Sequence, residues 1–271
     1  MLSKIFRNPI DVWPALLVTG LFAILLLLYL YVDSLWLMAA CSFLLLLPRL
    51  SVVGYNHNHV HTMTFKSTML NRLLEVIMFF ETGTSPHSGT LNHIIGHHAC
   101  YFNPAIDTLN TRRADGSTLG RHEFSFRSAL WHYPSCITFS RGKRELRTKF
   151  IAHLAVCLIL LGAVVAYKPA AAAIVFVVPM LIMLYMLKWS AWAHHSGLPM
   201  GDDFTASRTH TGKFYNWLTW NAGYHAAHHF RQATHWSMLP TYHAELSDRI
   251  AADLQGHGWG TRFPPSNMRA G

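Results

Sequence analysis

Eight histidines of this chain lie in three short clusters, and their spacing could support metal chemistry. The clusters are His57-x-x-x-His61, His93-x-x-x-His97-His98 and His225-x-x-His228-His229. Each cluster lies beside strongly apolar sequence, where an imidazole is costly unless it coordinates a ligand or finds a polar partner. Neutral imidazole is the commonest protein ligand for transition metals, so the clusters predict a shared metal centre.

Helical spacing would turn the histidines of each cluster toward one pocket. Residues three or four apart lie on one face of an α-helix. His57 is therefore expected to point the same way as His61, and His93 the same way as His97. His98 can then serve a second metal, and the third cluster forms one face with three donors. Two iron ions would take about the number of nitrogens that the clusters offer.

Other uses of histidine fit the sequence less well. A haem takes one or two histidines and would leave most of the set unexplained. A carboxylate di-iron site would show Glu-x-x-His pairs, and the sequence has none. A non-enzymatic membrane metal carrier, which is an alternative, usually has acidic residues within its spans, and the apolar runs lack them. The cysteines, at scattered positions that predict neither a disulfide framework nor a Cys-type zinc site, are Cys41, Cys100, Cys136 and Cys157.

The composition is typical of a membrane protein. Of the 271 residues, 51% are hydrophobic and only 13% are charged, whereas soluble domains have roughly 25% charged residues. The formal net charge of +9 fits a face lying against anionic lipid or an acidic protein partner. No nucleic-acid-binding motif is present, so we expect no nucleic-acid partner.

Four apolar runs predict four transmembrane helices in two hairpins. Each has close to the roughly 20 residues needed to cross the hydrocarbon. The runs cover about 15–32, 35–47, 151–167 and 170–187, the last continuing helically to about His195. Asp33-Ser34 separates the first two, Lys168-Pro169 separates the last two, and Pro48-Arg49 ends the second. The shorter run 73–80 predicts an interfacial or buried helix.

The distribution of Lys and Arg predicts the orientation. The segment 51–149 contains eleven of them, whereas the turns between spans contain only Lys168. By the positive-inside rule, the N-terminus and the segments 51–149 and 188–271 are cytoplasmic. We therefore predict an all-α, multi-pass integral membrane protein with a single domain, 1–271. Its cytoplasmic helical cap would carry all three histidine clusters.

The clusters and their surroundings resemble a known family. The segments 54–65, 93–103 and 221–229 resemble, in order, the three histidine boxes of the membrane fatty acid desaturase/hydroxylase superfamily. The motif His194-His195-Ser-Gly-Leu-Pro resembles the single-histidine motif that such proteins carry after the fourth span. The similarity covers roughly residues 54–240.

The resemblance implies two iron ions and a set of nine ligands, with no catalytic residue beyond them. The implied ligands are His57, His61, His93, His97, His98, His195, His225, His228 and His229. Residues that could lie behind them are His59, Asn58, Asn103, Asp107, His194 and Asn221. Asn58 stands where the family has Asp, so Asp107 or the pair Asp202-Asp203 could supply the missing carboxylate. His59 lies about 200° round the helix from either ligand of its box, as an outer or interfacial residue.

The implied activity is O2-dependent oxidation of an unactivated C–H bond in a membrane lipid, with desaturation of a fatty acyl chain as the leading reading. Alternatives within the superfamily are hydroxylases or ketolases of alkyl chains, sphingolipids or carotenoids. The sequence contains no haem or iron–sulfur module. An external electron donor, such as ferredoxin or a cytochrome b5-like protein, is therefore expected.

Overall fold

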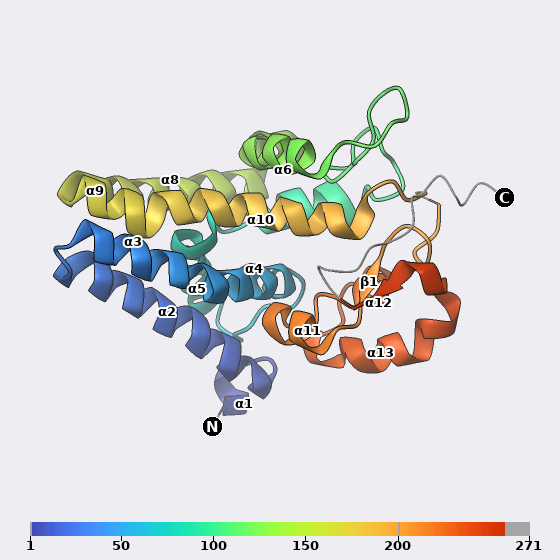
Figure 1. Ribbon diagram of the computed structural model, residues 1–271, viewed down its shortest axis with the longest axis horizontal. Helices are drawn as coiled ribbons and strands as arrows, with labels where there is room; N and C mark the ends of the chain where they lie inside the picture. Colours follow the sequence, from blue (N-terminus) through green and yellow to red (C-terminus); the bar gives the residue numbers. More distant parts are fainter. Residues whose placement is uncertain (1, 200, 258–271) are drawn as a thin grey trace. The chain divides into compact units, whose positions relative to one another are not determined.

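The chain folds mainly as helices in the computed structural model, which describes residues 2–199 and 201–257 (Figure 1). Part of the predicted cytoplasmic segment 188–271 thus lies outside the described residues. The described strands are β1 (Thr209–His210) and β2 (Gln255–Gly256), which pair in parallel.

The helices divide between two compact units. The first comprises Met1–Gly89 and Ser140–Leu184, and the second comprises Thr90–Phe139 and Tyr185–Gly271. In the first unit lie α1 (Leu2–Ile5), η1 (Pro9–Asp11), α2 (Val12–Tyr31), α3 (Leu35–Leu44), α4 (Leu46–His61), α5 (Thr68–Thr82), α8 (Arg144–Tyr167), α9 (Pro169–Ala172) and η3 (Ala173–Val177). In the second lie η2 (Thr90–His98), α6 (Arg121–Leu130), α7 (His132–Phe139), α11 (Lys213–Thr219), α12 (His225–Phe230), η4 (Trp236–Met238), α13 (Leu239–Leu246), η5 (Ser247–Arg249) and η6 (Ala252–Leu254). The helix α10 (Val178–His195) belongs to both.

Among the described residues, three helices are long and apolar enough to cross a membrane, and a fourth span is present if a bent pair counts as one. The three are Pro9–Tyr31, Arg144–Tyr167 and Pro169–His195. The bent pair is α3 followed by α4, with a bend of 48°. These helices correspond to the four predicted runs.

The predicted end of the second run at Pro48-Arg49 is wrong. A new helix, α4, begins at Leu46 and continues through both residues to His61. Proline is tolerated there because the first N–H groups of a helix have no intrahelical partner to lose. The first histidine cluster therefore lies at the end of the bent span.

Helix α5 is the centre of the first unit, where it contacts α2, α4, α8 and η3. The fully buried Arg49 fastens α4 to this centre. Its guanidinium donates to the carbonyl of Val175 at 2.5 Å and to the carbonyl of Glu81 at 3.4 Å. These bonds fix the helix that carries His57 and His61.

In the second unit, α7 packs along η2, and α12 packs against α13 and β1. The alanines of α12, Ala226 and Ala227, are fully buried in a cluster with Leu198 and Phe204. These small residues pack α12 into the core of the second unit.

Candidate metal centre

The second histidine cluster lies in a π-helix, η2, rather than in the expected α-helix. In an α-helix, residues five apart lie about 140° apart round the axis. The i→i+5 bonding of η2 instead brings His93 and His98 together, with their Nε2 atoms 3.0 Å apart. His93 therefore shares its group with His98, while its ring also stacks on that of His97 with centroids 5.5 Å apart.

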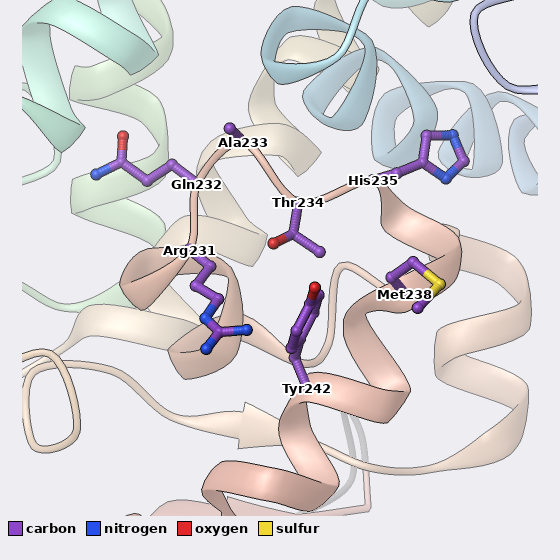
Figure 2. Close-up of a pocket in the computed structure, with 7 residues that line it drawn as sticks. All are labelled: Arg231, Gln232, Ala233, Thr234, His235, Met238 and Tyr242. Atoms are coloured by element: carbon purple, nitrogen blue, oxygen red, sulfur yellow. The ribbon is translucent and has the colours of Figure 1, made fainter.

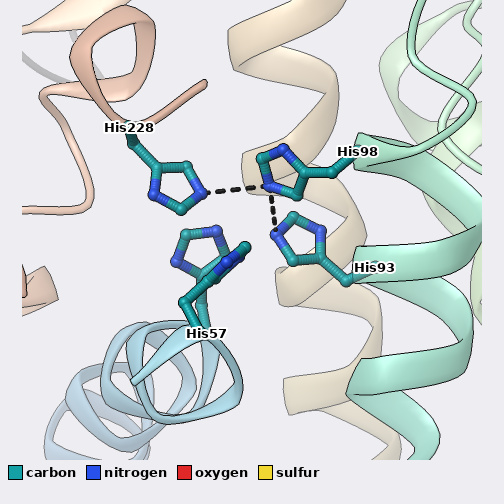
Figure 3. A group of neighbouring side chains, drawn as sticks. His57, His93, His98 and His228 are labelled. Carbon is teal, nitrogen blue, oxygen red and sulfur yellow. Dashed lines mark hydrogen bonds between the residues drawn. The ribbon is translucent and has the colours of Figure 1, made fainter. Parts of the chain in front are cut away.

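A first group of imidazoles contains His93, His98 and His228 (Figure 3). The Nε2 atom of His98 lies between the other two, 3.0 Å from that of His93 and 3.1 Å from that of His228. Two nitrogens bound at about 2.1 Å to one metal at a right angle would lie about 3.0 Å apart. The spacing therefore suits three ligands of one ion.

A second group contains His97, His195 and His229, whose ligand atoms lie within 4.8 Å of one another. His225 adjoins this group, because its Nε2 lies 2.9 Å from that of His195 and 3.2 Å from that of His229. All four side chains are buried. The second unit thus gathers two sets of imidazoles.

The hydrogen bonds of two histidines in the second group show that a cation fits there. His97 donates from Nδ1 to Asp107 at 2.8 Å, and His195 donates from Nδ1 to the carbonyl of Ala206 at 3.2 Å. A neutral imidazole carries one proton, so Nε2 of each ring presents a lone pair. Nε2 of His97 is buried and has no hydrogen-bond partner among the described residues. Converging buried lone pairs require a metal ion or a proton between them.

Burial keeps His225 and His229 of the third cluster in the neutral form that binds metals. Burial lowers the pKa of His225 well below its ordinary value, and the adjacent His194 lowers it further. The pKa of His229 is lowered by burial and by His98. Neutral imidazole is the form that donates a lone pair to a transition metal.

The third cluster does not form one three-donor face. Helix α12 directs His228 to the first group, and His225 and His229 to the second. The reason is that adjacent residues of an α-helix lie about 100° apart round the axis, so His228 points away from His229, whereas residues four apart, such as His225 and His229, lie about 40° apart. One short helix therefore connects both groups.

The first cluster, in the other unit, follows the expected helical spacing. The rings of His57 and His61, one turn apart on α4, have centroids 5.4 Å apart. His59 is fully buried rather than interfacial. Its Nδ1 lies 2.7 Å from the hydroxyl of Thr64, and its Nε2 lies 3.4 Å from Glu75 on α5. His59 thus anchors the end of α4.

The predicted outer residues differ in position. Asp107 is buried and accepts the hydrogen bond from His97, which orients that ring. A carboxylate in this position is typical of metal-binding histidines. Asn103 is exposed and caps a turn through the N–H of Ala105. Asp202, one of the other acids considered, is also exposed.

His194 packs directly against a predicted ligand. Its ring stacks on that of His225 with centroids 4.0 Å apart, and its Nδ1 donates to the carbonyl of Arg208 at 2.8 Å. Asn221 adopts a left-handed conformation with φ of 63° and donates to the carbonyl of Trp236 at 3.1 Å. Asn58 is buried on α4. His194 thus holds the ring of His225 against α10.

Tyr101 is a residue of this centre that the sequence did not single out. It is buried, and its ring stacks on that of His229 with centroids 4.1 Å apart. It also contacts the rings of His97 and His195. Burial raises the pKa of Tyr101, so the phenol is protonated at neutral pH. The sequence offered one indication of this role, because Tyr101 lies four residues, or about one helical turn, after His97.

An open cavity of about 540 Å³ is lined by residues that come directly after the third cluster in the sequence (Figure 2). Its lining comprises Arg231, Gln232, Ala233, Thr234, His235, Met238 and Tyr242. The guanidinium of Arg231 lies 4.4 Å from the ring centroid of Tyr242. None of the predicted metal ligands lines this cavity, so we assign the metal chemistry to the imidazole groups.

Apolar helices that could span a membrane, together with two buried groups of imidazoles, define a membrane protein with a histidine-rich centre able to hold metal. A comparison with protein families gives the particular family. Residues 34–262 match the profile described as fatty acid desaturase. The chain therefore belongs to this family, within the membrane fatty acid desaturase/hydroxylase superfamily. Comparisons with curated proteins and with solved structures found no match.

Proposed function

We propose that this protein is a di-iron oxidase that desaturates an acyl chain of a membrane lipid. The observation that carries the proposal is the division of seven buried or half-buried imidazoles of the second unit into two groups. The family match supports an oxidoreductase. Two groups of donors are what two iron ions would need.

We assign nine ligands to the two ions. They are His57, His61, His93, His97, His98, His195, His225, His228 and His229; within the second unit, His93, His98 and His228 would serve one ion, and His97, His195, His225 and His229 the other. The helical spacing of His57 and His61 supports their assignment as ligands, because both rings project from α4 within one turn. An imidazole shell is neutral, so the buried carboxylate of Asp107 supplies part of the balancing charge.

The protein's own contribution is to orient the donors and exclude water. When bound, the iron pair supplies the reduction of O2 and the removal of two hydrogen atoms from adjacent methylenes. The overall change is –CH2–CH2– plus O2, two electrons and two protons to –CH=CH– plus two waters. Asp107 and the carbonyl of Ala206 fix the rings of His97 and His195 so that each Nε2 faces the centre.

The two electrons come from an external donor, ferredoxin or a cytochrome b5-like protein, because the sequence contains no redox module of its own. The donor would dock on the cytoplasmic side, where the positive-inside rule places the segments 51–149 and 188–271. The four spans would form two hairpins beneath this cap, all within a single domain.

We favour desaturation over hydroxylation because the first two spans are closely linked. Only Val32, Asp33 and Ser34 separate α2 from α3. A narrow tunnel beside such a hairpin would suit an unbranched chain better than a carotenoid ring. It would hold two adjacent methylenes in line, and such alignment lowers a reaction barrier substantially. Hydroxylation of the same chain is the alternative.

Lipid mass spectrometry of cells with and without the gene tests the reaction. Desaturation predicts a lipid lighter by two mass units, whereas hydroxylation predicts one heavier by sixteen. With reductant, donor and 18O2, the purified protein should give an alkene without the label. A labelled alcohol or ketone as the only product would overturn desaturation and leave the oxidase proposal intact.

A further inference from the structure

One residue outside the π-helix η2 bonds to two of its carbonyls. Thr108 donates its hydroxyl to the carbonyl of Asn92 at 2.7 Å and its backbone N–H to the carbonyl of Gly96 at 2.9 Å. Both carbonyls belong to the segment that carries the second histidine cluster. Thr108 thus connects two carbonyls that lie four positions apart in the helix.

The end of η2 would have an unsatisfied carbonyl without this bridge. The last carbonyls of a helix have no following turn to donate to them. That of Ile94 accepts from the N–H of Ala99 in the i→i+5 pattern, and that of Ile95 accepts from the thiol of Cys100. The carbonyl of Gly96 accepts from Thr108 instead of from a further turn.

The fit between Thr108 and the helix is close. A Cβ atom added to Gly96 would lie 2.6 Å from Cγ2 of Thr108 and 3.0 Å from the carbonyl oxygen of Leu91. A side chain at position 96 would therefore push Thr108 away from the helix. Glycine at this position lets the threonine sit against the backbone.

The neighbouring residue holds the remaining histidine of the cluster. Asp107 accepts from Nδ1 of His97, whose Nε2 faces the second group. Thr108 bonds the carbonyl just before His93 and the carbonyl two residues before His98, and both of these histidines belong to the first group. Two consecutive residues of one loop therefore contact both parts of the cluster.

We propose that Thr108 is a positioning residue that keeps η2 in its π form and thereby keeps His93 and His98 on one metal ion. This inference rests on the proposed two-metal function. If the segment relaxed to an α-helix, the two imidazoles would lie about 140° apart and could not share an ion. The hydroxyl bond to Asn92 opposes that relaxation because, with the N–H bond to Gly96, it ties two carbonyls of η2 to one residue.

Metal content of hydroxyl-deletion variants tests the proposal. Thr108→Val keeps the shape of the side chain and removes the hydroxyl, whereas Thr108→Ser keeps the hydroxyl. Thr138→Val on α7 is the matched control, because its hydroxyl bonds to Pro134 within its own helix. Cobalt(II) or iron(II) is added to the folded detergent-solubilised proteins against a competing chelator, and bound metal is counted by elemental analysis.

We expect two metals per chain in wild type, Thr108→Ser and Thr138→Val, and one in Thr108→Val. Loss of an outer partner typically weakens metal affinity about 10- to 100-fold. Gly96→Ala, which displaces Thr108 by contact, should reproduce the one-metal state. Folded Thr108→Val and Gly96→Ala proteins with wild-type metal content, or with both metals lost, would overturn the inference and leave the proposed function standing. A wild-type protein that binds no metal would contradict the proposed function itself.

Discussion

At the scale of single residues, hydrogen bonds to carbonyls and carboxylates decide which nitrogen of each imidazole faces the centre. Asp107 and the carbonyl of Ala206 take up the Nδ1 protons of His97 and His195. Each Nε2 then presents a lone pair, so the metal would be bound through the same nitrogen in both rings. Metal affinity should therefore depend on residues that do not touch the metal.

Replacing Asp107 by Ala should weaken metal binding about 10- to 100-fold, because His97 loses the partner that fixes its ring and tautomer. The dissociation constant for cobalt(II), measured against a competing chelator, gives the effect. Asp115→Ala is the control, since Asp115 is an exposed loop acid whose oxygen bonds to Ser117. Equal affinities for the two variants would contradict the role of Asp107.

His210 should make the protein less stable in acid. Burial, together with Arg208 and Arg121, lowers its pKa to about 4, whereas the unfolded chain has an ordinary value of about 6.5. Between these values the unfolded chain binds a proton that the folded protein does not, so stability falls as pH falls through this window. With chelator present, His210→Asn should therefore lose less of its thermal midpoint between about pH 7 and about pH 4.5. An equal loss in wild type and variant would count against this.

At the scale of elements, the sequence predicted the long helices, because a long apolar run is enough to indicate them. It did not predict the geometry of the histidine clusters. The runs that became α2, α8 and α10 are visible because a membrane span needs a long apolar stretch. The π form of η2 was not visible, because it depends on Thr108, which bonds to it from a separate loop. For the same reason, sequence spacing did not predict the approach of His93 to His98.

The burial of His59 was also hidden in the sequence. A histidine placed between two expected ligands suggested an interfacial or outer residue. Its partner Glu75 lies sixteen positions away on α5, and no local pattern connects them. By contrast, the carboxylate of Asp107 could be anticipated as a candidate because the family's acid is replaced by Asn58.

The junction between α5 and η3–α10 should be sensitive to a single methyl group. Gly83 ends α5 with φ of 76°, and a Cβ there would lie 3.0 Å from the carbonyl oxygen of Met180. Gly83→Ala should destabilise the protein by more than about 1 kcal/mol through backbone strain and this contact. Gly142→Ala is the matched control. Gly142 has a similar φ of 75°, but a Cβ added there would have no heavy atom within 4 Å among the described residues outside its immediate neighbours. The thermal midpoint of Gly83→Ala should be the lower of the two, and the reverse order would contradict the account.

At the scale of the whole molecule, the proposal requires all three histidine clusters to lie on one side of the membrane. Two apolar helices long enough to span it, Arg144–Tyr167 and Pro169–His195, lie between the second and third clusters. An even number of crossings must therefore lie between the first and third clusters. The distribution of Lys and Arg predicts that this side is the cytoplasm.

Cysteine labelling tests that arrangement. Single cysteines at Ser34 and Ser117, both exposed, are introduced after the four native cysteines are replaced. A membrane-impermeant thiol reagent applied to intact cells should label position 34 and should reach position 117 only after the membrane is permeabilised. Labelling of position 117 from outside would show that the segment 51–149 is not cytoplasmic.

The iron content of the purified protein tests the central claim most directly. We expect about two irons per chain after mild detergent purification, held by the nine assigned histidines. His61→Ala, His97→Ala and His228→Ala should each lose iron, because neighbouring imidazoles cannot span the gap that the missing ring leaves. Quantification of iron in cells grown on 57Fe, with Mössbauer spectra of the same samples, measures both number and environment. Two irons in the wild type and a deficit in all three variants is the predicted result. Full iron occupancy in His228→Ala, whose Nε2 adjoins that of His98 at 3.1 Å, would contradict the assignment.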